Sequence, residues 1–280
     1  MRTNAGQGQI LYIPKIGQRA DFQHPLMNDC IGWWPLTDRG GDIVTDITSY
    51  KNHGAAYGNV DFSESQRGYA PDFGVRDATN YIQVNNVSVS LSKPLTISMW
   101  VYSRTLTGNH VGATFFLGSL VNGPRLDIMG KYTASSKFYQ LYSGASLLGN
   151  SEPQLNQWQH IVAVFNGVDS KIYVDGILDA QGDAGNHGAV SGFHLNSLGY
   201  NSGYPVNGKM QNIRFWSREL TDSEVLELYT NPWSGLNIPS ATRYFYFPPR
   251  PLSETIGTFK MRNLSFTPKS GGRTIIRKPS

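Results

Sequence analysis

The chain has little cysteine and no long apolar run. Cys30 is the single cysteine among 280 residues, so no disulfide can form within the chain, and a small domain stapled by several disulfides is excluded. No run approaches the roughly 18 apolar residues of a membrane-spanning helix. The first residues contain no apolar stretch of the kind found in secretory signals. We therefore expect a protein made in the cytoplasm, without a membrane partner.

Several catalytic motifs are also missing. Gly144-Ala145-Ser146 begins a nucleophile elbow of the Gly-x-Ser-x-Gly type, but two leucines follow it. The six histidines show no His-Glu-x-x-His or other metal-ligand spacing. Retaining glycosidases of the β-sandwich kind place paired acids on one strand as Glu-x-Asp-x-x-Glu, and this pattern does not occur. The sequence thus predicts that the protein is not an enzyme.

Short alternating apolar runs are what the chain does have. Leu95–Tyr102 alternates cleanly and predicts a half-buried central strand. The runs 161–165 and 171–174 flank an Asn166-Gly167 turn, and the second run ends in Asp175-Gly176, so consecutive β-hairpins are expected. Further strands are predicted at 31–36, 81–84, 115–120, 126–129, 138–142 and 211–216. These strands, with 30 glycines and 12% aromatic residues, predict an all-β protein.

One helix is predicted near the end of this strand-rich region. Thr221 and Glu224 have the spacing of a capping box, in which both side chains satisfy free backbone N–H groups. Apolar residues follow at Val225 and Leu228, and Asn231-Pro232 ends the helix. The densest acidic group lies here, and we interpret it as structural. Its members are Glu219, Asp222, Glu224 and Glu227.

Charge divides the chain into three zones. Residues 1–24 carry a net charge of +2, residues 25–232 carry −5, and residues 233–280 carry +7 and six prolines. We predict an extended N-terminal arm (1–24), a folded body (25–232) and a basic, proline-rich C-terminal arm (233–280). Basic ends on an acidic body favour arms that meet an acidic surface. The alternative is that the cations simply keep an extended tail soluble.

Apolar and aromatic residues within the two arms are the predicted partner-binding anchors. The C-terminal arm has too few cations around its aromatics for nucleic-acid binding, so we expect protein partners. The anchors are Ile10, Leu11, Tyr12, Ile13, Arg243, Tyr244, Phe245, Tyr246, Phe247, Ile275 and Ile276.

Four segments in order resemble laminin-G-like, or concanavalin A-like, jelly-roll domains. They are the loop 46–54, the strand 95–102, the hairpin 158–176 ("Trp-x-His … Tyr-Val-Asp-Gly") and the closing strand and helix 208–229. The resemblance implies a two-sheet antiparallel jelly-roll sandwich with one short C-terminal helix. It also implies core positions for Trp100, Trp158, Trp216 and His160.

The resemblance extends to function through Asn231-Pro232-Trp233, which is similar to the sequence after this module in some tailed-bacteriophage proteins. It implies a structural virion protein that decorates or cements a capsid. Its arms would contact other virion proteins such as the major capsid protein, and its copies would be arrayed on a lattice.

Two other functions stay open. The first is a lectin of a phage head or tail fibre that binds bacterial surface glycans through Tyr200, Asn201 and Tyr204, which lie in a loop rich in aromatics and amides. The second is a polysaccharide-degrading enzyme. No cofactor is expected other than the calcium ion that the family resemblance implies, with Asp46 and Asp72 as its acids. The competing interpretation is that both aspartates form Asx turns.

Overall fold

The structure is a computed structural model. It describes residue 14 and residues 17–74, 79–90, 94–105, 113–117, 125–130, 137–186, 189–196, 207–237, 266–268 and 274–276. The chain forms two compact units, Met1–Ile238 and Pro239–Ser280. The described residues include no helix long and apolar enough to span a bilayer.

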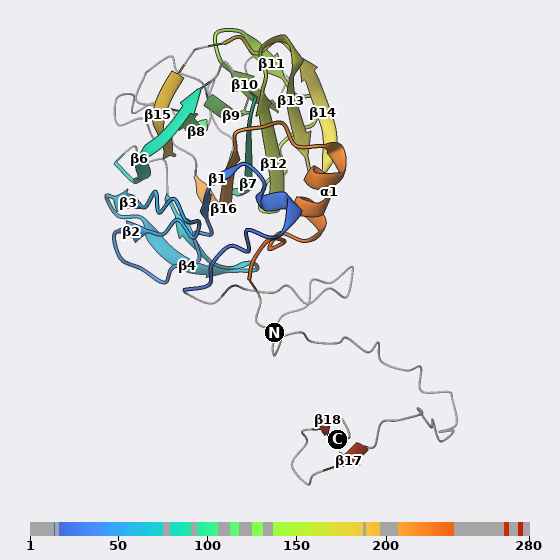
Figure 1. Cartoon of the computed structure of the whole chain (residues 1–280). Coiled ribbons are helices and arrows are strands. Elements are labelled where there is room, and N and C mark those ends of the chain that lie inside the picture. The colour runs from blue at the N-terminus through green and yellow to red at the C-terminus, as the bar shows by residue number, and fades with distance from the viewer. Residues whose placement is uncertain are drawn as a thin grey trace, which may run out of the picture. The chain divides into compact units, whose positions relative to one another are not determined.

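The first unit contains two antiparallel eight-stranded sheets (Figure 1). In the first sheet the order is β14-β13-β12-β7-β16-β5-β4, and β1 also pairs with β16. Its strands are β1 (Cys30–Trp34), β4 (Asp61–Ser65), β5 (Gly68–Asp72), β7 (Leu95–Ser103), β12 (Trp158–Phe165), β13 (Ser170–Val174), β14 (Ile177–Gly182) and β16 (Gly208–Trp216).

In the second sheet the order is β11-β10-β9-β8-β15-β6-β3-β2. Its strands are β2 (Ile43–Val44), β3 (Gly54–Tyr57), β6 (Tyr81–Ser90), β8 (Ala113–Leu117), β9 (Arg125–Gly130), β10 (Lys137–Tyr142), β11 (Ser146–Leu148) and β15 (Ala189–Leu195). Neighbours such as β7 and β16 are far apart in sequence, as in a jelly roll. The predicted all-β sandwich is confirmed.

The main core lies between the two sheets. One face of β7 contributes Ile97 and Met99, and β12 contributes Ile161 and Ala163. The second sheet faces them with Ile82, Val84, Tyr139, Leu141, Phe193 and Leu195. Trp34 packs edge-on against Phe193, with ring centroids 4.8 Å apart. Burial of these side chains is the main stabilising contribution to the sandwich.

A second core covers the outer face of the first sheet. Val162, Val164 and Trp216 point away from the sandwich interior and pack against Leu26 of η1 (Pro25–Met27) and Leu228 of α1 (Asp222–Thr230). Figure 1 shows α1 and the segment before β1 lying over this sheet. The prediction of a half-buried strand at 95–102 was therefore wrong, because β7 is buried on both faces over most of its length.

Both ends of the body extend past the predicted limits of 25 and 232. Ala20 pairs with Leu236 as an antiparallel bridge, and both side chains are buried in the second core. The Asn237 amide donates to the Arg19 carbonyl over 3.0 Å. Residues 17–24 and 233–237 thus belong to the folded body, since together they cover the outer face of the first sheet.

A bulge in β16 holds the closing segment in place. The register shifts between Gln211 and Arg214, and Asn212 adopts a left-handed conformation with φ 57°. Arg214 is fully buried, lies 3.5 Å over the Trp33 ring and donates to the Ser234 carbonyl over 2.7 Å. The bulge therefore turns a guanidinium outward to satisfy the carbonyls of the chain that follows α1.

The predicted hairpins and helix are present, with one turn different. Asp175 and Gly176 both have positive φ, as a two-residue turn requires. The β12–β13 connection is longer than the predicted Asn-Gly turn, because η2 (Gly167–Asp169) lies within it and the Ser170 hydroxyl donates to the Gly167 carbonyl. The Thr221 capping box of α1 is confirmed. In the second unit, β17 (Phe266–Pro268) pairs with β18 (Thr274–Ile276).

Candidate functional site

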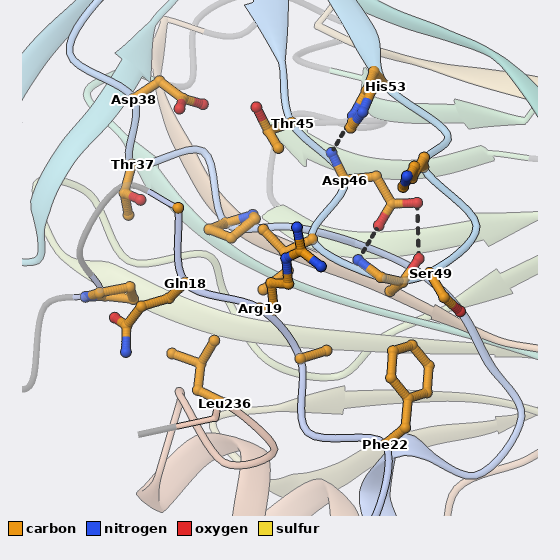
Figure 2. A pocket seen from close by; sticks show the side chains of 17 residues that line it. Gln18, Arg19, Phe22, Thr37, Asp38, Thr45, Asp46, Ser49, His53 and Leu236 are labelled. Atoms are coloured by element: carbon orange, nitrogen blue, oxygen red, sulfur yellow. Dashed lines mark hydrogen bonds between the residues drawn. The ribbon is translucent and has the colours of Figure 1, made fainter. Parts of the chain in front are cut away.

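A pocket of about 670 Å³ opens where the chain enters the body. One wall is formed by residues 17–20 and 22 with Leu236, and the other by residues 35, 37–38, 45–49, 51 and 53. Figure 2 shows Arg19 between these walls, with Phe22 at one end and Asp38 at the other. Its volume lies within the range of small-ligand sites, and it combines an aromatic ring with polar side chains.

Asp46 organises the loop of residues 45–53, which contributes to the second wall of the pocket. Its carboxylate accepts the backbone N–H groups of Trp33 (3.1 Å), Thr48 (2.9 Å) and Asn52 (2.9 Å), and also the Thr48 hydroxyl. The side chain is nearly inaccessible, at 2% exposure. Asp46 therefore tightens the loop as an Asx turn and fixes it to β1. Its oxygens are already occupied by protein donors.

Other polar groups of the pocket are open to a ligand. Within the described ranges, the side chains of Arg19, Thr37, Thr45 and Ser49 make no hydrogen bond. Asp38 is half-buried, and this burial raises the pKa of its carboxyl group. The pocket thus offers donors, hydroxyls and one available carboxyl group around a common space.

Asp72 lies at the end of β5, in a different set of contacts from Asp46. Arg104 donates to both of its oxygens, one at 2.9 Å, and Lys209 Nζ lies 3.7 Å away. The Gly74 N–H also donates to Asp72 Oδ1, which makes an Asx turn. Although burial works in the opposite direction, the Arg104 hydrogen bonds hold the pKa of Asp72 below its ordinary value.

The structure does not bring the two predicted calcium ligands into one contact network. In the described part of the chain, no three side chains of His, Cys, Asp or Glu gather as a metal site requires. The geometry of Asp46 and Asp72 is that of the competing interpretation, the Asx turn. Calcium binding stays a prediction.

The other predicted site residues lie mostly outside the described residues. This holds for the sugar-binding loop of Tyr200, Asn201 and Tyr204. It also holds for the arm anchors Ile10, Leu11, Tyr12, Ile13, Arg243, Tyr244, Phe245, Tyr246 and Phe247. Ile275 and Ile276 lie in β18, opposite Thr267 and Phe266.

Residues interpreted as structural are engaged within the fold. Glu219 pairs with Lys171, Asp222 accepts the Tyr173 hydroxyl, and Glu224 pairs with Arg218. His160 is 1% exposed, and its Nε2 lies 2.8 Å from Ser98 Oγ. Trp100 and Trp216 are buried, whereas Trp158 is half-buried on the outer face of the sheet.

Phe22 and Asp38 were not predicted from the sequence as site residues. Both lie in segments without alternation or a recognisable motif, and the pocket forms only when the entering chain meets the loop after β1. The one available signal was the resemblance of residues 46–54 to an early loop of laminin-G-like domains, which pointed to this loop.

A family model described as the concanavalin A-like lectin/glucanases superfamily matches residues 76–226, more than half of the chain. The chain belongs to this superfamily. No curated protein sequence matches it. As a concanavalin A-like protein, it shares a lectin- and glucanase-type fold with members that bind sugars and members that cleave them.

Solved structures show the same fold at low identity. Domain 4 of AbnA, an extracellular arabinanase from Geobacillus stearothermophilus, in complex with arabinotriose, is 17% identical over 72% of this chain and 98% of that domain, with a TM-score of 0.56. The binding domain of botulinum neurotoxin DC, in complex with SialylT, is 13% identical over 73% of this concanavalin A-like chain and 52% of that one (TM-score 0.54).

An enzyme also appears among these structures. Trypanosoma rangeli sialidase is 16% identical over 71% of this chain, with a TM-score of 0.51, and the chain spans only 32% of the sialidase. The chain therefore spans 52% of the neurotoxin domain and 32% of the sialidase, whereas it spans 98% of the arabinanase domain.

Proposed function

We propose that this protein binds a saccharide in the pocket between residues 17–22 and 35–53 and does not cleave it. The observation that carries the proposal is the pocket's composition. An exposed aromatic ring, Phe22, accompanies unpaired hydroxyls, a guanidinium and a carboxyl group in a space large enough for a small oligosaccharide. Sugars present both apolar ring faces and hydroxyl groups, so they match this mixture.

The carboxylates of the pocket argue for binding over hydrolysis. Most retaining and inverting glycosidases use two available carboxyl groups. Asp38 and Asp46 are the acids among the described lining residues, and the Asp46 carboxylate is saturated by four donors. A single available acid cannot serve as both proton donor and nucleophile or base.

The similar structures support the same proposal. The arabinanase domain was solved with arabinotriose, and the neurotoxin binding domain was solved with SialylT. At 17% and 13% identity they supply only the fold, so the pocket itself must be tested.

The test is a glycan array with the full chain, followed by calorimetry on the best ligand. Phe22→Ala and Asp38→Asn should each weaken binding about tenfold, which corresponds to about 1.4 kcal/mol. Tyr50→Ala is the matched control, because Tyr50 is 57% exposed but does not line the pocket. Absence of any glycan ligand, or unchanged affinity in both pocket variants, would refute the proposal. Release of reducing ends from the bound glycan would show an enzyme.

A second role is attachment to a virus particle, as a decoration protein of a tailed bacteriophage held by its ends. The charge distribution supports it, since residues 233–280 carry eight cations and one acid while residues 25–232 are net acidic. Gln18 and Asn237 lie together, with Gln18 Nε2 donating to the Asn237 carbonyl over 3.4 Å. The two ends of the described body therefore lie side by side.

This role is tested with a shortened chain spanning residues 17–238, the body described above. The shortened protein should keep its glycan affinity and its cooperative unfolding. It should lose binding to virus particles that were assembled without the full-length protein. Normal occupancy of such particles by the shortened chain would contradict attachment through the arms, while leaving the saccharide proposal intact.

A further inference from the structure

A row of side chains crosses one end of the first sheet on its outer face. Trp158 of β12 lies opposite Tyr102 of β7 in the register. Lys209 of β16 lies opposite both Tyr102 and Asp72 of β5. Directly paired residues share one face of a sheet. Because the adjacent Val101 points into the main core, these four residues form an outer row.

The aromatic half of the outer row is partly open. Trp158 and Tyr102 are both half-buried, and their ring centroids are 5.7 Å apart at an interplanar angle of 55°. The neighbouring ring of Trp100 is 6% exposed and lies under Arg67. Two adjacent, partly exposed rings offer an apolar surface of the kind that packs against the C–H face of a sugar.

Arg104 places an accessible guanidinium beside the charged half of the row, where it donates to Asp72. Arg104 follows β7, and its side chain is 32% exposed, against 14% for Asp72 and 11% for Lys209. Arg104 Nη1 donates to Asp72 Oδ1 (2.9 Å) and to Asn207 Oδ1 (3.1 Å), which fixes the plane of the group. Nη2 also donates to Asp72 Oδ2, so two of the five guanidinium donors, Nε–H and one N–H of Nη2, make no hydrogen bond to the described residues.

Arg67 adds a cation without a carboxylate partner. Its Cζ lies 3.5 Å from the Trp100 ring centroid and 6.0 Å from that of Trp158. The residue is 6% exposed, Nε donates to Gln211 Oε1, and Nη2 finds no hydrogen-bond acceptor among the described residues. Burial lowers the pKa of this guanidinium, which reflects the cost of a charge that no anion compensates.

The charge of this region is positive. Three cations, Arg67, Arg104 and Lys209, stand against the carboxylates of Asp72 and of Asp61, which faces Asp72 across β4 and β5. None of the residues that line the saccharide pocket belongs to this row. The row is therefore a separate surface whose rings fit a sugar and whose charge fits an anion.

We propose that the outer row, together with the adjacent Arg104 and Arg67, is a second binding site, specific for an acidic saccharide. One sugar ring packs on Trp158 and Tyr102, and its carboxylate accepts hydrogen bonds from Arg104 in the field of Arg67 and Lys209. Charge-assisted bonds from a guanidinium to a carboxylate are directional, so the site distinguishes acidic from neutral sugars. The inference does not depend on the pocket.

Affinity gel electrophoresis of the full chain tests the site, with polygalacturonate, alginate and polysialic acid as acidic probes. Methyl-esterified polygalacturonate keeps the sugar rings and removes the charge. We expect retention by at least one acidic polymer, weaker retention by the ester, and a tenfold or larger loss of affinity in Arg104→Gln and Trp158→Ala. Arg104→Lys should retain part of the affinity, because it keeps the charge and loses the planar fork.

Controls separate this inference from the proposed function. Phe22→Ala, in the pocket, should leave acidic-polymer retention unchanged, as should Tyr50→Ala on the surface. Urea unfolding confirms that each variant is folded. The inference is overturned if no acidic polymer retards the wild-type chain, or if folded Arg104→Gln and Trp158→Ala variants are retarded as strongly as wild type. Loss of all retention in Phe22→Ala alone would assign acidic sugars to the pocket.

Discussion

Acidification should destabilise the body through His160. The imidazole is 1% exposed, and it packs 5.1 Å from the Trp100 ring centroid. Burial, with the nearby cations Arg67 and Arg214, lowers its pKa to about 3. The folded protein thus holds a neutral His160 down to pH values at which the unfolded chain is already protonated.

The sign and size of the effect follow from linkage. An unfolded histidine has a pKa of about 6.5, so between that pH and about 3 the unfolded state binds one more proton than the folded state. The contribution of His160 to the free energy of unfolding is therefore fully present above about pH 7. It falls as the pH drops, by up to about 1.4 kcal/mol per pH unit. At pH 5 the loss attributable to His160 is about 2 kcal/mol.

The assay is urea denaturation of the full chain at pH 8 and at pH 5, repeated with His160→Gln. Glutamine keeps a polar group near Ser98 Oγ, which lies 2.8 Å from His160 Nε2, but it does not titrate. The wild type should lose about 2 kcal/mol more than the variant between the two pH values, whatever the variant costs at pH 8. Equal losses in both proteins would refute a buried neutral His160.

Three further outcomes are expected. Arg214→Met should lower the free energy of unfolding in urea by about 3 kcal/mol, because several carbonyls lose their buried donor. The control Arg39→Met, on the surface, should change it little. Thr221→Ala should lower the free energy of unfolding by about 1 kcal/mol through loss of the helix cap. An unchanged free energy of unfolding would show that the capping box does not stabilise the protein. Burial raises the pKa of Cys30 to about 12, so thiol reagents should react with it at pH 8 only after urea unfolding.

The sequence predicted those parts of the fold that depend on local pattern. Alternation located β7 and β12, and the spacing of Thr221 and Glu224 located α1. It did not predict that β7 is buried on both faces, because Ser98 and Thr96 on the outer face are polar and look like surface residues. They are covered by segments distant in sequence, and Thr96 Oγ1 donates to the Arg218 carbonyl.

The candidate sites were less predictable for the same reason. The pocket requires residues 17–22 to lie against residues 45–53, a contact that no local spacing signals. The family resemblance implied Asp72 as a calcium ligand, but its partner Arg104 lies 32 positions away, and no local spacing links the two residues. A carboxylate in a loop suggests a metal until the cation that neutralises it is known.

The Ala20–Leu236 bridge has a mechanical consequence. The two backbone segments that enter and leave the body are hydrogen-bonded to each other at residues 19–21 and 235–237. A force applied to both ends of the body would therefore load these few bonds one after another, like a zipper, and would not shear a long ladder at once. Under tension the Ala20–Leu236 bridge should open at low force and uncover the second core, while the two sheets stay packed against each other.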